Sequence, residues 1–276
     1  MNEANLVEYG GGLRLFTYTW MPKDDPRAVV LLVHGYGEHA GRYASFAKEL
    51  NKHALGVIAY DHRGHGRSEG KRGYIESFAL LLDDFFRVFH EVQVRWPQTP
   101  LLLMGHSMGG LVLALALEEQ KFTVNGAVFS SPFLALPDDV PRALLALARP
   151  LGRFLPWLPV SQLDTEALSR IPSKVAEYEQ DPLVYHGKIT ARTGAELQQA
   201  VDRATVRFEK ITVPFCIVHG TADRLAPLRG AHLLYRRAGA EDKTLRTFEG
   251  GYHELLNDLC ADDVRTFLIQ WLLHHV

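Results

Sequence analysis

Cysteine is scarce in this chain, whose 276 residues include only Cys216 and Cys260. The two cysteines lie far apart in the sequence and form no C-x-x-C pair, which argues against a cysteine-based metal site or redox function. Cys216 falls within an apolar, strand-like stretch, so we interpret it as a small residue of the core.

The sequence also lacks the features of nucleic-acid-binding, membrane-spanning and secreted proteins. The chain has no basic excess, since 30 Lys and Arg residues stand against 32 Asp and Glu residues, and we therefore expect no nucleic-acid partner. It has no apolar run as long as a bilayer span. Its first residues show no basic region followed by an apolar stretch, so we expect no signal peptide and a cytoplasmic location.

What the sequence does contain is an alternation of short apolar runs and helical patterns. Continuous apolar runs predict strands buried on both faces of a parallel sheet, and they cover residues 28–33, 56–60, 101–104, 127–130 and 215–219, with a weaker run at 244–248. Residues 13–20 alternate and predict a hairpin with residues 6–9. Helical patterns cover residues 43–50, 78–96, 108–119, 230–238 and 263–275. This alternation predicts an α/β fold with right-handed crossovers.

One long segment interrupts the alternation. The strand pattern disappears between residues 132 and 209, where repeated prolines divide the chain into short helices. We therefore predict a core formed by residues 1–131 and 210–276, with a helical cap of residues 132–209 inserted late in the sheet.

The stretch Gly105-His106-Ser107-Met108-Gly109 is a G-x-S-x-G pattern placed between a predicted strand and a predicted helix. A serine on such a turn adopts a strained backbone conformation that exposes its hydroxyl above the sheet. The sequence therefore predicts that Ser107 is a nucleophile; the alternative is a glycine-rich turn whose serine only caps the helix.

A serine nucleophile needs a base, and the base needs an orienting acid. Asp223 and His253 each follow a late predicted strand through a short turn, which gives the order Ser107, Asp223, His253 of an α/β-hydrolase. His106 adjoins the serine, but we expect its side chain to point away across the turn. The alternatives are a surface-loop role for His253 and a turn-forming role for Asp223.

Two backbone N–H groups should form an oxyanion hole. Met108 follows the serine and is one predicted donor, and Tyr36 in the loop after the strand at 28–33 is the other. We expect His34 to brace this loop by hydrogen bonds.

The turn Asp61-His62-Arg63-Gly64-His65 resembles a metal site at first sight, because it holds an acid and two histidines. No H-E-x-x-H or comparable spacing supports a metal. We instead expect a polar turn in which Asp61 and Arg63 satisfy buried backbone groups.

Taken together, several motifs resemble those of monoacylglycerol lipases and their lysophospholipase-like relatives; they are residues 34–43, 61–68, 105–110, 181–183, 219–223 and 252–255. The resemblance implies an α/β-hydrolase that cleaves monoacylglycerol to fatty acid and glycerol without a cofactor or metal. It implies the same catalytic and oxyanion residues, and it places Glu38, Arg42 and Tyr178 near the glycerol end of the substrate. Tyr36 departs from the family, which often has a smaller residue there.

The predicted cap contains an apolar stretch dotted with Arg142, Arg149 and Arg153. This composition suits transient contact with a membrane or micelle surface; the alternative is an ordinary amphipathic helix packed on the protein below.

Other enzyme functions are possible alternatives to a monoacylglycerol lipase. One is a broader carboxylesterase or lysophospholipase. Another is a proline-iminopeptidase-like peptidase, which would need an acidic pair with Glu38 as one candidate. A non-catalytic hydrolase-fold protein is disfavoured by the complete triad. The sequence leaves the oligomeric state open.

Overall fold

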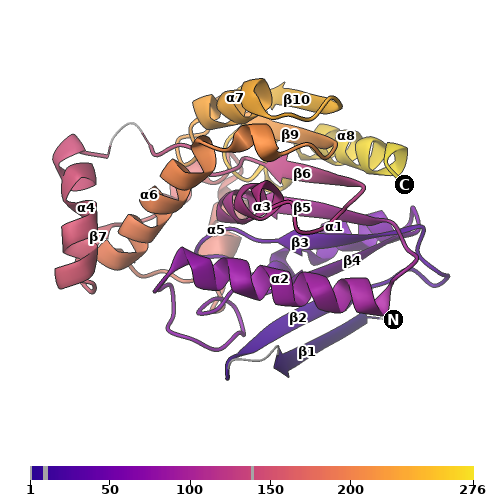
Figure 1. The fold of residues 1–276 in the computed structure, drawn as a ribbon, viewed down its shortest axis with the longest axis horizontal. Coiled ribbons are helices and arrows are strands. Elements are labelled where there is room, and N and C mark those ends of the chain that lie inside the picture. Colours follow the sequence, from indigo (N-terminus) through magenta and orange to yellow (C-terminus); the bar gives the residue numbers. More distant parts are fainter. Residues whose placement is uncertain (1, 9–11, 138–139) are drawn as a thin grey trace.

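An eight-stranded, mostly parallel sheet forms the centre of the protein (Figure 1). The computed structural model describes residues 2–8, 12–137 and 140–276. The strands lie in the order β1-β2-β4-β3-β5-β6-β9-β10. They are β1 (Asn2–Glu8), β2 (Arg14–Trp20), β3 (Ala28–Val33), β4 (Leu55–Tyr60), β5 (Leu101–His106), β6 (Gly126–Ser130), β9 (Phe215–Gly220) and β10 (Lys243–Phe248). β1 and β2 form the predicted antiparallel hairpin, and β2 is antiparallel to β4, whereas the remaining neighbours run parallel.

The five continuous apolar runs become the five central strands. Every residue of β3, β4, β5, β6 and β9 is buried, which explains why their sequences show no polar alternation. The edge strand β10 is only partly buried and correspondingly gave the weaker pattern. The predicted strands are confirmed to within two residues at each end, except that β1 begins at Asn2, four residues before its predicted start. In the hairpin, residues 9–11 lie outside the described part of the chain.

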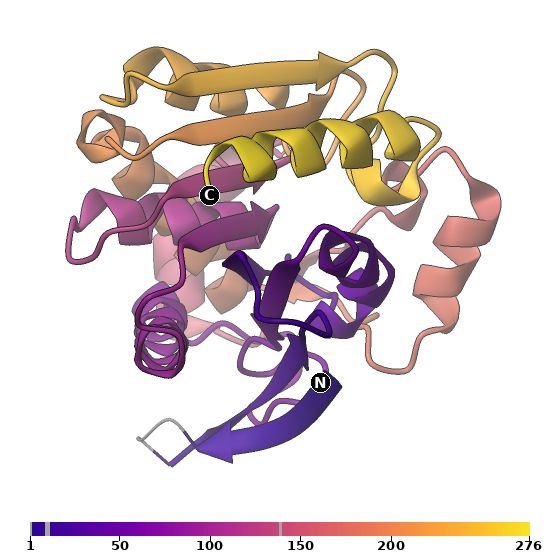
Figure 2. The ribbon, with the colours of Figure 1, turned by 90° about the vertical axis from the view of Figure 1, so that its right-hand side faces the viewer.

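Helices cover both faces of the sheet (Figure 2). One face is covered by α1 (Ala44–Asn51), which follows the short 3₁₀ helix Ala40–Tyr43, and by α8 (Ala261–His274). The other face carries α2 (Phe78–Arg95), α3 (Met108–Glu118) and α7 (Leu228–Arg237). All residues of α3 are buried, as its almost uniformly apolar sequence requires.

The segment between β6 and β9 adds three helices beside this core: α4 (Arg142–Phe154), α5 (Pro172–Gln180) and α6 (Ala191–Thr205). In Figure 1, α6 lies between α4 and the rest of the molecule. The prediction that this segment lacks strands was wrong in one detail. β7 (Pro159–Ser161) and β8 (Ile189–Thr190) form a small antiparallel pair, and strands of three and two residues are too short to produce a period-two pattern.

The topology brings loops from distant parts of the chain to one edge of the sheet. The strands β3, β5, β6, β9 and β10 are parallel, so their carboxyl ends lie together, and that is where ligands bind in open α/β sheets. Among the described residues, no helix combines the length and the apolar character needed to cross a membrane.

Candidate active site

Ser107 occupies the sharp turn between β5 and α3. Its backbone angles are φ 52° and ψ −116°, a conformation that non-glycine residues rarely adopt. The turn is held by hydrogen bonds from the Ser107 N–H to the carbonyl of Ser130 (3.0 Å) and from the Phe133 N–H to the carbonyl of Ser107 (3.0 Å). A side chain on Gly105 would lie 2.6 Å from the carbonyl oxygen of Gly109, so the turn can close only around glycine.

Asp223 and His253 meet although they belong to different loops. The Nδ1 atom of His253 lies 2.8 Å from Oδ2 of Asp223. The side chain of Asp223 is fully buried, and its Oδ1 accepts the N–H groups of Leu225 and Ala226, both at 2.9 Å. Burial opposes ionisation of Asp223, but its contacts with His253 and His219 outweigh that effect and lower the pKa of its carboxyl.

The charge of His253 responds to the same contact. Burial alone would lower the pKa of this imidazole, but the carboxylate of Asp223 beside Nδ1 raises it, with further contributions from Glu254 and Glu38. With Nδ1 held by Asp223, the opposite nitrogen of the ring is free to exchange a proton with another group.

The expectation for His106 was wrong. Its ring does not point away from the site: it lines the same cavity as Ser107, and its centroid lies 4.8 Å from that of His253. The cause is a hydrogen-bond contact of 3.1 Å between its Nδ1 and the carbonyl of Ser130 on β6. Burial, followed by the nearby His253, lowers the pKa of His106 to about 4, so this imidazole is neutral at physiological pH.

His219 is a contact that the sequence analysis missed. Its Nε2 lies 3.3 Å from Oδ2 of Asp223 and 2.8 Å from the carbonyl of Ala226, so it packs against the back of the carboxylate. In the sequence, His219 is the last residue of the predicted strand 215–219. Its spacing of four residues before Asp223, across the turn that ends β9, was the available signal.

The loop between β3 and α1 lies directly against the serine. A side chain on Gly35 would lie 3.1 Å from Cβ of Ser107, and both Tyr36 and Met108 line the cavity at Ser107. His34 braces this loop as expected, since its Nε2 accepts the N–H of His62 at 2.9 Å. Met108 is the first residue of α3, where helical N–H groups have no partner within the helix.

The polar turn after β4 holds together as a structural unit. Asp61 accepts the N–H groups of Ala40 and Arg67, both at 2.8 Å, as predicted. The guanidinium of Arg63 instead forms a two-pronged ion pair with Asp84 of α2, at 2.6 and 2.7 Å, which corrects the expectation that it satisfies backbone groups. In the described part of the chain, no group of three or more His, Cys, Asp or Glu side chains is arranged to hold a metal ion.

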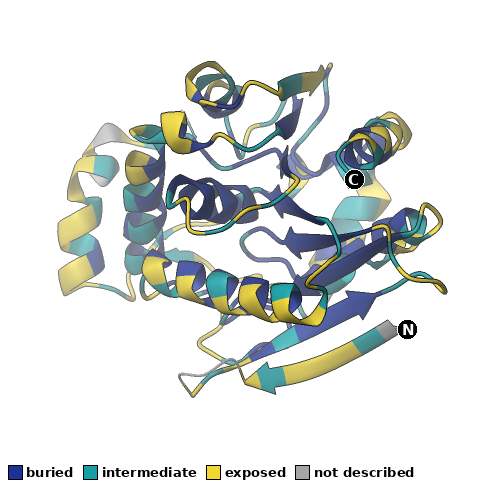
Figure 3. Cartoon of the chain, turned by 45° about the vertical axis from the view of Figure 1, so that its right-hand side comes forward, coloured by how far each residue is buried: buried dark blue, intermediate teal, exposed yellow. Residues whose placement is uncertain are grey.

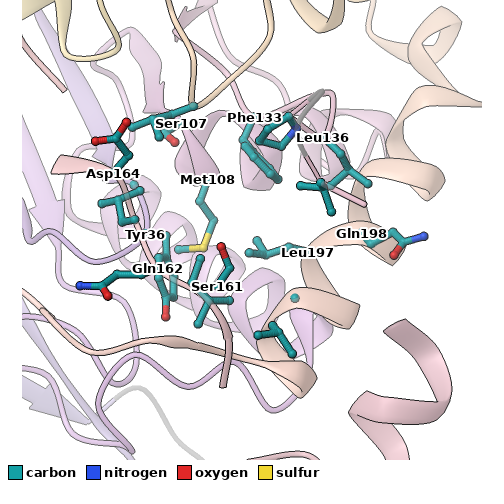
Figure 4. A pocket seen from close by; sticks show the side chains of 18 of the residues that line it. Tyr36, Ser107, Met108, Phe133, Leu136, Ser161, Gln162, Asp164, Leu197 and Gln198 are labelled. Carbon is teal, nitrogen blue, oxygen red and sulfur yellow. The ribbon is translucent and has the colours of Figure 1, made fainter. Parts of the chain in front are cut away.

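A cavity of about 370 Å³ opens at Ser107 and His253. Figure 4 shows Ser107 and Asp164 at one side of it and Leu136, Leu197 and Gln198 at the other, with Met108 between them. Most of its walls away from the serine are apolar, and they come from α4, α6 and the segments beside them: Phe133, Leu136, Val140, Leu145, Ala148, Leu151, Val160, Ile189, Ala195 and Leu197. Such a cavity can hold a linear hydrocarbon chain next to the serine.

The three residues predicted near the glycerol end of the substrate lie together beside this cavity. Glu38 and Tyr178 line it. The guanidinium carbon of Arg42 lies 4.8 Å from the centre of the Tyr178 ring, and Arg42 also contacts Glu38 and Glu254. The buried hydroxyl of Tyr178 has no hydrogen-bond partner among the described residues, and it lies next to Gly37, where an added Cβ would be 3.0 Å away.

Comparison with known proteins identifies the family of this chain. Residues 24–260 match the family described as serine aminopeptidase, S33. The chain is 38% identical over 266 residues to the monoacylglycerol lipase of Mycolicibacterium smegmatis, covering 95% of each chain. It is 38% identical over 249 residues to the monoglyceride lipase of Homo sapiens, covering 90% of this chain and 82% of the human one.

A solved structure shows the same relationship. The crystal structure of Paleococcus ferrophilus monoacylglycerol lipase matches with a TM-score of 0.86 at 35% identity, covering 95% of this chain and 99% of that one. The serine turn, the α/β sheet and these identities over nearly the whole length lead to one conclusion: the chain belongs to the monoacylglycerol lipase family of α/β-hydrolases.

Proposed function

We propose that this protein is a serine hydrolase that cleaves monoacylglycerols to a free fatty acid and glycerol. The observation that carries the proposal is a cavity with Ser107 and His253 in its wall and a largely apolar lining beyond them. An acyl chain fits such a lining, and an ester carbonyl at its end would lie beside the serine. The names of the relatives at 35–38% identity support the same substrate.

In the proposed mechanism, the hydroxyl of Ser107 attacks the ester carbonyl while His253 takes its proton. Asp223 keeps the imidazole oriented through Nδ1 and stabilises the imidazolium that forms. The backbone N–H groups of Tyr36 and Met108 hold the oxyanion. His253 then gives the proton to the departing glycerol oxygen. Water, activated by the same imidazole, hydrolyses the acyl-enzyme, which releases the fatty acid and restores Ser107.

We place the glycerol end of the substrate beside Glu38 and Tyr178. Tyr178 offers an unpartnered buried hydroxyl, and a carboxylate at Glu38 can accept hydrogen bonds from alcohols. Arg42 lies behind these residues and is already bonded to carboxylates, so its influence on the substrate passes through Glu38 and Tyr178.

Two alternative substrate classes suit the charges of the site less well. A peptidase that holds a free amino terminus needs an acidic pair with uncompensated negative charge, but the guanidinium of Arg42 offsets one of the two charges of Glu38 and Glu254. A lysophospholipid phosphate needs an excess of positive charge, but Arg42 is bonded to two buried carboxylates and Arg224, which lines the cavity, has the carboxylate of Asp164 3.1 Å away. A broader carboxylesterase activity on short esters is compatible with the same cavity.

A substrate panel tests the proposal. Initial rates would be compared for monoacyl-, diacyl- and triacylglycerols, a lysophospholipid, a short nitrophenyl ester and a proline arylamide. We expect monoacylglycerol and the short ester to be cleaved rapidly, triacylglycerol slowly because one narrow cavity must admit it, and the arylamide not at all. Preferred cleavage of the lysophospholipid or the arylamide would replace monoacylglycerol as the proposed substrate.

We further propose that residues 132–209 act as a cap on the core formed by residues 1–131 and 210–276. Apolar residues on the inner side of α4, including Leu145 and Leu151, line the cavity. Its outer side is exposed (Figure 3). Five large apolar residues are between 42% and 74% exposed: Leu147 in the middle of α4, and Phe154, Leu155, Trp157 and Leu158 at its C-terminal end or just beyond it. Exposed Arg149 and Arg153 accompany them, a composition that suits contact with a micelle or membrane surface; the side chain of Arg142 lies outside the described part.

Movement of the cap is expected in α4 rather than in α5. The segments that flank α5 are tied to the core: His39 contacts Asp181 at 2.9 Å, and the Tyr185 N–H donates to the carbonyl of Gly37 at 2.7 Å. The end of α4 contacts the core through the ring of Trp157, 4.3 Å from that of Tyr74, and the nearby carbonyls of Pro156 and Leu158 accept the N–H groups of Arg192 and Ala191 at the start of α6. An opening of α4 would leave the loop beside Ser107 in place.

Leu147→Glu is expected to raise the apparent KM for aggregated monoacylglycerol about tenfold or more, while hydrolysis of a soluble short ester stays near normal. Leu147 is 52% exposed, so the change removes an apolar contact with lipid at little cost to the fold. Burying a leucine contributes about 1.5–3 kcal/mol, and 1.4 kcal/mol corresponds to tenfold. Trp157 is a poorer choice, because its ring also contacts Tyr74 and Lys71.

Val94→Glu is the matched control for Leu147→Glu. Val94 is 62% exposed near the end of α2, at the opposite side of the molecule from α4 (Figure 1). The Val94→Glu variant should leave the hydrolysis of aggregated monoacylglycerol and of the soluble short ester unchanged. Equal loss of both activities in a well-folded Leu147→Glu variant would mean that the cap has a structural role only.

A further inference from the structure

The guanidinium of Arg42 joins two carboxylates from distant parts of the chain. Its Nη1 lies 3.0 Å from Oε2 of Glu38. Nη1 and Nη2 lie 2.5 and 2.7 Å from the two carboxylate oxygens of Glu254, 212 residues further along the chain. All three side chains are nearly buried, with 12% of Arg42, 5% of Glu38 and 7% of Glu254 exposed.

Each carboxylate belongs to a loop that carries a proposed catalytic group. Oε1 of Glu38 accepts the N–H of Gly35 at 2.7 Å and the hydroxyl of Tyr43 at 2.8 Å, which fixes the turn that contains Tyr36. Glu254 directly follows His253 in the sequence. Arg42 therefore connects the loop of an oxyanion donor to the loop of the base.

The geometry at Glu254 is specific to arginine. Two parallel N–H groups face two carboxylate oxygens, an arrangement that fixes orientation as well as distance and that lysine cannot reproduce. Burial opposes ionisation of Glu254, but the charge and hydrogen bonds of Arg42 outweigh it and hold the pKa of its carboxyl well below the usual range. The ring of Tyr178 covers one side of the guanidinium. The guanidinium of Arg42 is therefore surrounded by groups of the protein itself.

The histidine loop has a second attachment on the cap side. The N–H of Glu254 donates to the carbonyl of Leu168 at 2.8 Å, and Asp258 accepts the N–H groups of Tyr252 and Arg170 at 2.8 and 2.9 Å. These bonds hold the loop to the segment before α5. Arg42 supplies the complementary attachment toward the oxyanion loop.

We propose that Arg42 is a positioning residue, which with Glu254 sets the separation between the His253 loop and the Tyr36 loop. The inference deepens the proposed function, since it rests on the roles given there to His253 and Tyr36. It assigns Arg42 to the alignment of the reacting groups for any ester, with or without a glycerol moiety.

The first test uses a soluble short-chain ester, which has no glycerol to bind. Arg42→Lys keeps the charge but loses the fork, and Glu254→Gln keeps the shape but loses the charge. We expect each to lower kcat by about 10- to 100-fold with little change in KM, because misplacement of reacting groups by about 1 Å can cost that much. If only the KM for monoacylglycerol rises and the ester rate is retained, Arg42 binds glycerol and the inference is overturned.

The second test uses the pH profile, which a purely structural role would not move. His253 faces Asp223, Glu254, Glu38 and His106. Loss of the negative charge in Glu254→Gln lowers the pKa of His253, so the acid limb of kcat/KM moves to lower pH. Loss of the positive charge in Arg42→Met moves it to higher pH. In the double variant Arg42→Met/Glu254→Gln the net charge equals that of the wild type, so the acid limb returns while kcat stays low.

The matched control is Arg63→Lys. Arg63 forms a comparable two-pronged pair with Asp84, 18% and 3% exposed, and neither residue lines the cavity. The Arg63→Lys variant should have lower thermal stability than the wild type, but the same kcat and the same acid limb of kcat/KM. If the Arg42 and Glu254 variants lose no more kcat than this control, or if the double variant regains kcat, the inference fails.

Different measurements test the role of Arg42 and the proposed function. Labelling of wild-type Ser107 by a fluorophosphonate and the wild-type substrate panel test the function, whereas only ratios between variants and wild type test Arg42. Circular dichroism and the labelled fraction establish folding. Should Arg42→Lys not fold, Glu254→Gln and the double variant decide the question by the same criteria.

Discussion

Ser107→Ala is expected to lose about 10⁴-fold or more of the wild-type kcat, while the protein stays folded. The reason is the backbone at this residue. The turn between β5 and α3 holds Ser107 at a positive φ, with the first turn of α3 beside its hydroxyl. Without the hydroxyl no acyl-enzyme can form. Activity on monoacylglycerol and a short ester, measured beside a thermal melt, would check the prediction.

Labelling with a fluorophosphonate gives an independent reading of the same prediction. Mass spectrometry should locate the label on Ser107 in the wild type and find none in Ser107→Ala. Ser161 provides a matched control, because it also lines the cavity but lies on the short strand β7 rather than on an elbow. Ser161→Ala should keep the label on Ser107. A label elsewhere, with activity retained in Ser107→Ala, would reject the assignment.

The central sheet could be predicted from the sequence because its strands are buried on both faces. The run of residues 28–33 contains no polar residue, so both of its ends can be recognised in the sequence. The structure places β3 at Ala28–Val33. The cap was harder to predict. Its β7–β8 pair joins residues about thirty positions apart through strands of three and two residues, and neither carries a local pattern.

In the candidate site, too, residues within a local sequence pattern could be predicted, whereas contacts between distant segments could not. Residues tied to a local motif could be found: Ser107 by its elbow, and Asp223 and His253 by their turns after late strands. Their contact at 2.8 Å is what the strand order implies, and their catalytic roles stay predictions. Contacts between loops could not be found, because nothing near Arg42 in the sequence indicates Glu254, 212 residues away.

The predicted orientation of the His106 side chain was wrong for a related reason. Neighbouring side chains on a strand alternate between the two faces, a rule that is consistent with the expectation that the His106 ring points away across the turn. At the end of β5 the chain turns, and the contact of His106 with the carbonyl of Ser130 holds its ring in the cavity wall. A side chain at the last position of a strand follows its hydrogen bonds rather than the alternation.

The second large effect is expected for Asp223→Asn, which should lower kcat by roughly 10³- to 10⁴-fold with the fold intact. Oδ1 of Asp223 accepts two backbone N–H groups and Oδ2 contacts His253, so an asparagine can occupy the site. Its amide no longer fixes the proton on Nδ1 or stabilises the imidazolium. Since the carboxylate is what raises the pKa of His253, the acid limb of kcat/KM should also move to lower pH.

The structure allows a sharp comparison with other acids close to His253 in the sequence. Glu249 is exposed, and Glu249→Gln should retain both the rate and the pH profile of the wild type. Asp258 is fully buried, but its carboxylate is taken by Arg170 and by the N–H of Tyr252. Kinetics across pH 5–9 for Asp223→Asn, Glu249→Gln and the wild type, with thermal melts for each, would settle the assignment. A near-normal rate in a folded Asp223→Asn variant would transfer the orienting role to another carboxylate, with Asp258→Asn as the next variant to measure.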